Sequence, residues 1–153
     1  MRRRRLRSKG DHVDNTAIDA LMTAKTIAVV GLDSRMDRPA YRIAKYLQDA
    51  GYRIVPVHRG QFPADEVLGE RAYRSLRDIP HPVDVVDVFV RPEFTDPIID
   101  DAIVIGAGAV WLQLGIRNQA GIDRARSAGL AAIHNRCTMV THRDTKAAQT
   151  TDG

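Results

Sequence analysis

A loop with hydroxyl and cationic side chains follows the first short apolar run of the chain. The run Ile-Ala-Val-Val at 27–30 ends at Gly31, and Ser34, Arg35 and Arg38 come shortly afterwards. Backbone amides at the start of a helix attract anions, and arginines add donors that suit phosphate oxygens. A glycine after a strand is a weak signal by itself, but this loop as a whole predicts a phosphate-binding position.

The same loop lacks the glycine spacing of a dinucleotide-binding turn. In the pattern G-x-G-x-x-G starting at Gly31, Asp33 and Met36 occupy the second and third glycine positions. A tight turn over a pyrophosphate is therefore disfavoured.

A basic pair follows the second apolar run, which ends at Val57. Sites for NAD carry an acidic residue after the second strand, where it holds the ribose hydroxyls. His58 and Arg59 stand there instead. Two interpretations remain open: the pair binds a ribose phosphate, as in NADP or coenzyme A, or it is a solvated surface pair.

Three later loops hold further candidate side chains. Phe89 and Arg91 follow one apolar run, and Phe89 either packs in the core or lines an adenine slot. Gln113 ends another run, close to Gly115. Cys137 follows the last run, where it is either a nucleophile paired with a histidine or, more commonly at a strand end, a small buried residue.

No arrangement of residues in the sequence matches an established catalytic motif. We find no nucleophile elbow, no Walker loop and no H-E-x-x-H. The single cysteine excludes an internal disulfide and a metal site built from several cysteines. We therefore expect a protein without catalysis of its own and without a metal.

Strands and helices alternate along the chain and would position these loops. Apolar runs predict strands at 27–30, 53–57, 84–90, 109–114 and 130–133, and helical spacing predicts helices at 39–50, 97–105 and 119–128. We expect a Rossmann-like α/β fold: a doubly wound, mainly parallel five-stranded sheet with helices on both faces and an open strand order. The segment 58–80 is predicted to be irregular, with a short extended piece near Tyr73. Ligands of such sheets bind beyond the carboxyl ends of the strands, so the candidate loops would meet at one edge.

Both ends of the chain look less structured than the region between them. Six basic residues lie within the first nine, more than the net charge of +4. We expect a flexible basic tail at 1–22, the domain at 23–142 and a flexible polar tail at 143–153. The simplest interpretation of the arginines is a solvated tail; the alternatives are an extension outside the fold and an anchor for nucleic acid or anionic lipid. Without an apolar run of roughly 18 residues or a secretory signal, we expect a cytoplasmic protein with no membrane span.

Seven stretches, taken in order, resemble the small bacterial CoA-binding family, which is similar to the N-terminal domain of the succinyl-CoA synthetase α subunit. They begin at Ile27, Arg38, Gly51, Leu68, Val83, Ala109 and Asn135, and read IAVVGL, RPAYRIAKYL, GYRIVPV, LGE, VDVVDVF, AVWLQLG and NRC. The resemblance extends over residues 25–142, which is the whole of the predicted domain.

The resemblance implies coenzyme A, or acyl-coenzyme A, as a ligand along the carboxyl edge of the sheet. The phosphates would lie near Gly31, Leu32, Asp33, Ser34, Arg38 and Pro39; the adenosine or its 3′-phosphate near Val57, His58 and Arg59; the adenine near Phe89, Val90 and Arg91; and the pantetheine near Gln113, Gly115 and Cys137. The family usually has an asparagine-proline pair after Val57, so the adenosine contacts stay open. Ligase activity is not expected, because the synthetase's phosphohistidine lies in a second domain that has no counterpart here.

The leading hypothesis is therefore a coenzyme A-binding protein. The sequence identifies no protein partner, and nucleic acid is not the expected one. Two alternatives remain: an NADP-linked oxidoreductase, which the basic pair at 58–59 permits, and a thiol-responsive protein in which Cys137 forms a mixed disulfide with the coenzyme thiol.

Overall fold

The computed structural model describes residues 9–60 and 65–151, and a parallel sheet forms its centre. Its five strands lie in the order β2-β1-β5-β6-β7, and each runs parallel to its neighbours. The strands are β1 (Thr26–Val30), β2 (Arg53–Val57), β5 (Val85–Val88), β6 (Ala109–Leu112) and β7 (Ala131–Ile133). The predicted Rossmann-like α/β fold is confirmed, and the strand order reverses direction between β1 and β5.

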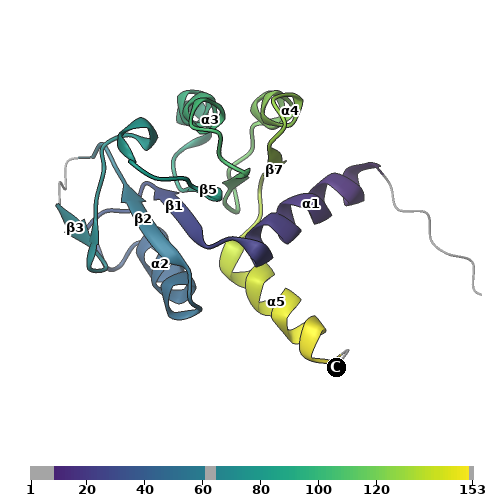
Figure 1. The fold of residues 1–153 in the computed structure, drawn as a ribbon, viewed down its shortest axis with the longest axis horizontal. Helices are drawn as coiled ribbons and strands as arrows, with labels where there is room; N and C mark the ends of the chain where they lie inside the picture. Colours follow the sequence, from purple (N-terminus) through teal and green to yellow (C-terminus); the bar gives the residue numbers. More distant parts are fainter. Residues whose placement is uncertain (1–8, 61–64, 152–153) are drawn as a thin grey trace, which may run out of the picture.

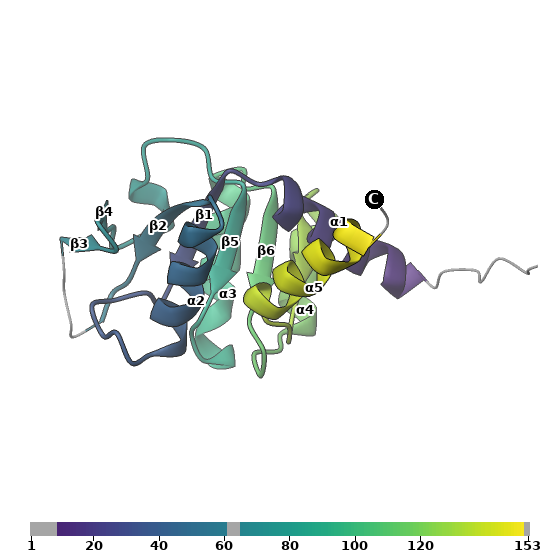
Figure 2. The ribbon, with the colours of Figure 1, turned by 90° about the horizontal axis from the view of Figure 1, so that it is seen from below.

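Helices cover both faces of this sheet (Figure 1). One face carries α3 (Thr95–Val104) and α4 (Gln119–Ser127), and the other carries α1 (Lys9–Thr23), α2 (Pro39–Asp49) and α5 (Thr138–Thr151). Figure 2 shows α2 and α5 side by side over the second face, where they are in contact. Among the described residues, none of the helices combines the length and apolar character needed to cross a membrane.

Each central strand contributes to two cores, because successive side chains of a strand point to opposite faces. Val29 of β1 packs in the core that includes Leu47 of α2, whereas Val30 packs in the core that includes Ile99 of α3. Burial on both faces explains why the strands appear in the sequence as continuous apolar runs rather than alternating ones.

The helix ends follow the local signals of the sequence. Gly51 has a φ of 108° after the last turn of α2, a conformation that glycine adopts without strain. Asn118 caps α4 by accepting a hydrogen bond from the Gly121 amide at 2.9 Å. The start of α3 is two residues earlier than predicted, at Thr95, because the 3₁₀ turn η2 (Pro92–Phe94) leads directly into it.

The amino-terminal segment differs from the predicted flexible tail. Residues 9–23 form α1, in which Ala17 and Leu21 are completely buried. Tyr52 also donates its hydroxyl hydrogen to the Leu21 carbonyl at 2.7 Å. Ala17 and Leu21 are four residues apart and share one helix face, but an alanine contributes little to an apolar pattern. The folded unit therefore includes residues 9–23 and does not begin at residue 23 as predicted. Residues 1–8 lie outside the described part.

The carboxy-terminal segment also differs from the prediction. Residues 143–151 continue α5, which begins at Thr138 and buries Thr141 and His142. His142 pairs with the Tyr46 hydroxyl through Nδ1 at 2.9 Å, which ties α5 to α2. Most side chains beyond residue 142 are exposed, so their polar composition reflects a solvated helix face rather than an absence of structure.

The segment after β2 contains a small hairpin that the sequence analysis did not predict. It consists of β3 (Glu66–Val67) and β4 (Glu70–Arg71), and the 3₁₀ turn η1 (Leu76–Asp78) follows. The extended piece expected near Tyr73 is confirmed, because Tyr73 forms an isolated parallel bridge with Val57.

Candidate functional site

A cleft of about 640 Å³ opens at the carboxyl edge of the sheet, with walls that include the ends of β1 and β5. Open α/β sheets bind ligands at such a point, where the strand order reverses. Seven residues predicted from the sequence line the cleft: Gly31, Arg38, Pro39, Phe89, Arg91, Gln113 and Cys137. They come from segments after four different strands, so the topology brings together residues more than a hundred positions apart in the sequence.

Gly31 allows the β1–α2 loop to approach the chain after β5. Its φ is 98°, and a Cβ atom added there would lie 2.8 Å from the Phe89 carbonyl oxygen. Its amide donates to the Val57 carbonyl at 2.8 Å, so this amide is not available to a ligand phosphate. The role of Gly31 is therefore to shape the cleft rather than to supply a phosphate donor.

Asp33 and Arg35 form a close ion pair next to Gly31. Arg35 donates from Nη2 to Asp33 Oδ2 at 2.7 Å and from Nε to both carboxylate oxygens at 3.0 Å. Burial raises the pKa of Asp33, but the hydrogen bonds and charge of Arg35 outweigh burial and hold that pKa below its ordinary value. The aspartate is thus ionised at neutral pH, and its charge offsets that of Arg35 at the cleft.

Arg38 and Arg91 supply positive charge that, in the described part of the chain, no ion pair offsets. Both side chains are exposed, and within residues 9–60 and 65–151 neither forms an ion pair. The helix α2 starts beside them at Pro39 without a side-chain cap. The Tyr41 and Arg42 amides donate to the Arg38 carbonyl, and the positive end of the helix dipole adds to the field of the two arginines. This side of the cleft is suited to phosphate groups.

The rest of the lining is largely apolar. It includes Ile43 of α2, Phe89, Leu114 and Ile116. Leu114 is 70% exposed, more than any other large apolar side chain in the described part of the chain. Exposed apolar groups at a cleft are typical of ligand contact. Cys137, a half-buried free thiol, belongs to the wall on the β7 side.

Gln113 is held by a buried network at its end of the cleft. Its Nε2 donates to Asp87 Oδ1 at 2.6 Å and to Thr138 Oγ1 at 2.7 Å, and the Thr138 hydroxyl donates to Asp87 Oδ2 at 3.0 Å. Burial raises the pKa of Asp87 to about 7, against the opposing effect of the hydrogen bonds from Gln113 and Thr138. Because both amide hydrogens of Gln113 are used, its carbonyl oxygen is the group that remains for a ligand donor.

The other predicted residues lie near the cleft but are not part of its lining. They are Leu32, Asp33, Ser34, Val57, His58, Arg59, Val90 and Gly115. Of the basic pair, Arg59 is exposed, whereas His58 is only 7% exposed and its Nδ1 is buried without a partner in the described part. His58 therefore does not belong to a solvated surface pair.

Four lining residues were not singled out from the sequence: Ala40, Ile43, Leu114 and Ile116. Arg35, which the sequence analysis named as a donor of the predicted phosphate loop, also lines the cleft. Ile43 lies on the apolar face of a predicted helix, and nothing in the sequence distinguishes a core contact from a cleft contact there. Asp87 was also missed, although an aspartate inside the apolar strand Val-Val-Asp-Val is a recognisable signal.

Known proteins share both the sequence pattern and the fold. Residues 25–143 match the family model described as the CoA binding domain. The uncharacterized protein YneT of Bacillus subtilis (strain 168) is 37% identical over 128 residues, which cover 84% of this chain and 93% of that protein. A hypothetical protein from Pyrococcus horikoshii OT3 is 35% identical with a TM-score of 0.80, covering 93% of this chain and 98% of that one.

A larger enzyme has the same fold in one of its parts. The dinucleotide-forming acetyl-coenzyme A synthetase 1 of Ca. Korarchaeum cryptofilum is similar at 24% identity with a TM-score of 0.63, covering 72% of this chain and 26% of that one. The family match extends over nearly all of the described domain, and the chain belongs to the CoA binding domain family.

Proposed function

We propose that the cleft binds coenzyme A or acyl-coenzyme A, and that the chain binds this ligand without catalysing a reaction. The supporting observation is the polarity of the cleft: Arg38, Arg91 and the uncapped start of α2 on one side, and an apolar wall with Cys137 on the other. Coenzyme A has the same division, with a phosphorylated adenosine at one end and an uncharged arm ending in a thiol at the other.

Two features of the cleft suit the two halves of this ligand. Hydrogen bonds between arginines and phosphates are among the stronger polar contacts in proteins, so Arg38 and Arg91 would account for much of the affinity. On the other side, the carbonyl oxygen of Gln113 would accept from an amide of the pantetheine arm, since its amide hydrogens are already used by Asp87 and Thr138.

The hydrogen bonds of two histidines support binding without catalysis. A nucleophilic Cys137 requires a base within hydrogen-bond reach. His134 Nδ1 accepts instead from the Asn118 amide at 3.0 Å, and His142 Nδ1 pairs with the Tyr46 hydroxyl. The described part of the chain contains no hydrogen bond between Cys137 and either of these histidines, whose Nδ1 atoms bond to other residues.

Calorimetric titration of the full chain with coenzyme A, pantetheine, NADP and NAD tests the proposal. We expect Arg38→Ala and Arg91→Ala each to weaken coenzyme A binding by about tenfold, or about 1.4 kcal/mol, because each loses a charge-assisted contact. Pantetheine binding should be unchanged, since that ligand carries no phosphate. Arg53→Ala is the matched control, as Arg53 is an exposed arginine at the start of β2, on the opposite edge of the sheet.

Unfolding measurements give a second readout. Coenzyme A at a hundredfold excess over its Kd should stabilise the chain by about 2.7 kcal/mol. Equal stabilisation by NAD would contradict the ligand assignment, and tighter binding of NADP than of coenzyme A would favour the oxidoreductase alternative.

A further inference from the structure

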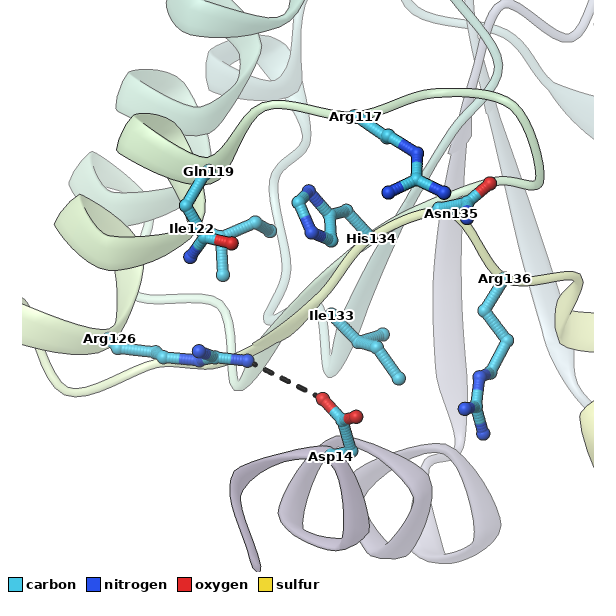
Figure 3. Close-up of a pocket in the computed structure, with 9 residues that line it drawn as sticks. All are labelled: Asp14, Arg117, Gln119, Ile122, Arg126, Ile133, His134, Asn135 and Arg136. Carbon is cyan, nitrogen blue, oxygen red and sulfur yellow. Dashed lines mark ion pairs between the residues drawn. The ribbon is translucent and has the colours of Figure 1, made fainter. Parts of the chain in front are cut away.

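A second cavity, of about 360 Å³, lies on the outer side of β7, between α1 and α4 (Figure 3). Its wall carries Arg117, Arg126, Arg136 and His134, against one carboxylate, Asp14. With a neutral histidine, these lining residues leave a formal excess of two positive charges. Such an excess in a concave site strengthens the local field for anions.

The polar groups of this cavity are mostly hydrogen-bond donors. His134 Nδ1 accepts from the Asn118 amide at 3.0 Å, so in the neutral ring the proton is on Nε2. Asn135 Oδ1 accepts from the Gly115 amide at 2.8 Å, which leaves its NH₂ group to donate. Figure 3 shows the Arg117 guanidinium turned toward His134 and Asn135.

The arginines of the cavity are incompletely paired. Within the described residues, Arg117 and Arg136 form no ion pair. Arg126 Nη2 donates to the Ala132 carbonyl at 2.9 Å and lies 3.6 Å from Asp14 Oδ1, whereas its Nε is buried without a partner in the described part. Burial lowers the pKa of His134, and the charges of Arg117 and Arg126 lower it further, as expected for an electropositive site.

The cavity is distinct from the coenzyme cleft, although the two share loops. In the loop after β6, Ile116 lines the cleft and Arg117 lines the cavity. In the loop after β7, Cys137 lines the cleft and Arg136 lines the cavity. Adjacent residues thus face two different sites.

We propose that this cavity is a second ligand site, which binds the phosphate group of a small phosphomonoester. Arginine forks and the His134 Nε2 hydrogen match the several oxygens of a phosphate dianion. The cavity is larger than a phosphate ion, which leaves room for an organic substituent. Asp14 opposes binding, because its negative charge repels the anion and partly offsets the positive charge of Arg126.

An NMR titration of the full chain at constant ionic strength tests this site, with inorganic phosphate and phenyl phosphate as the probes. We expect saturable shifts of the amides at 117 and 134–136, and tighter binding of phenyl phosphate. Asp14→Asn should strengthen binding by about threefold or more, and Arg117→Ala should weaken it by about tenfold, through loss of a charge-assisted contact. Arg91→Ala, which alters only the cleft, should have no effect.

Three results would overturn the proposal. The first is a set of linear shifts that chloride reproduces. The second is weaker binding in Arg91→Ala, which would place the anion in the cleft. The third is equal affinity for the two probes, which excludes a phosphomonoester. Arg117 is exposed, so Arg117→Ala is expected to fold, and its thermal unfolding without phosphate provides the check.

Discussion

Two buried carboxylates lie beside residues that line the cleft: Asp33 pairs with Arg35, and Asp87 bonds to Gln113. Burial raises the pKa of both. At Asp33 the charge and hydrogen bonds of Arg35 reverse the effect, whereas Asp87, hydrogen-bonded to the uncharged Gln113 and Thr138 and to the Val88 backbone, retains a pKa of about 7. The comparison shows that a cationic partner can lower the pKa of a carboxyl that burial raises, whereas uncharged hydrogen-bond donors around a completely buried carboxyl do not. Asp33 therefore stays ionised at neutral pH, whereas Asp87 gains or loses its proton near pH 7.

The largest expected effect concerns the pH dependence of stability. The pKa of Asp87 rises from 3.8 to about 7 on folding, so between these values the folded state holds a proton that the unfolded state has lost. Stability should therefore fall as pH rises through this window, by about 1.4 kcal/mol per unit and about 4 kcal/mol in total. Asp87→Asn should remove this slope, as measured by urea unfolding at pH 5 and pH 8.

The direction of the change makes this test specific. Asp87→Asn should be more stable than the wild type at pH 8, with a smaller difference at pH 5, where only part of the wild-type loss has occurred. An asparagine side chain can replace the protonated carboxyl in the network with Gln113 and Thr138. A variant that keeps the wild-type slope would show that another group is responsible.

A deletion of residues 1–21 provides a reference for the pH effect, because it removes buried side chains of α1 without removing Asp33 or Asp87. The chain would lose the buried side chains of Ala17 and Leu21, and the Tyr52 hydroxyl would lose its acceptor. We expect a loss of about 3 kcal/mol, equal at pH 5 and pH 8. Urea unfolding of a chain starting at Met22 provides the measurement; unchanged stability would mean that the packing of α1 contributes little.

Replacing Arg35 would leave Asp33, like Asp87, as a buried carboxyl without a cationic partner. Arg35→Gln leaves a buried carboxylate without its cation, so the pKa of Asp33 should rise. In the wild type, the stability from this pair is present above the ordinary pKa of 3.8 and is lost as pH falls through the lowered pKa. We expect the variant to be less stable than the wild type at pH 7, by an amount that solvent limits because Arg35 is 35% exposed.

Comparing the free energies of unfolding of Arg35→Gln and the wild type at pH 3 tests whether the effect depends on charge. There the Asp33 carboxyl is largely protonated in the unfolded chain, so the variant and the wild type should approach each other. An equal difference at pH 3 and pH 7 would assign the effect to packing rather than to charge.

The smallest expected effect on binding is that of Cys137→Ser, on the Gln113 side of the cleft. A thiol and a hydroxyl are similar in size, so coenzyme A affinity should change by less than about tenfold. The variant should lose the adduct that forms when the Cys137 thiolate attacks oxidised coenzyme A and displaces one coenzyme thiolate. Intact-protein mass spectrometry without reductant detects this adduct, and an unmodified wild type would exclude the thiol-responsive alternative.

Much of the fold could be predicted from local patterns. The five strands are continuous apolar runs because each is buried on both faces, and glycines such as Gly51 mark helix ends. The helices at the chain ends were not predicted, because α1 buries an alanine and one leucine, and α5 buries threonines and a histidine. Their formation depends on packing against the sheet, which a weak apolar pattern does not reveal.

The position of the cleft also followed from the sequence, since parallel strands bring their following loops to one edge. Which side chains enter it was decided by the tertiary structure. Arg91 lines the cleft while His58 is buried, although both follow strands and both carry basic groups. The network of Asp87 and Thr138 joins residues 51 positions apart. Local spacing determines secondary structure, but side-chain direction in a loop and contacts between distant residues arise only when the elements pack together.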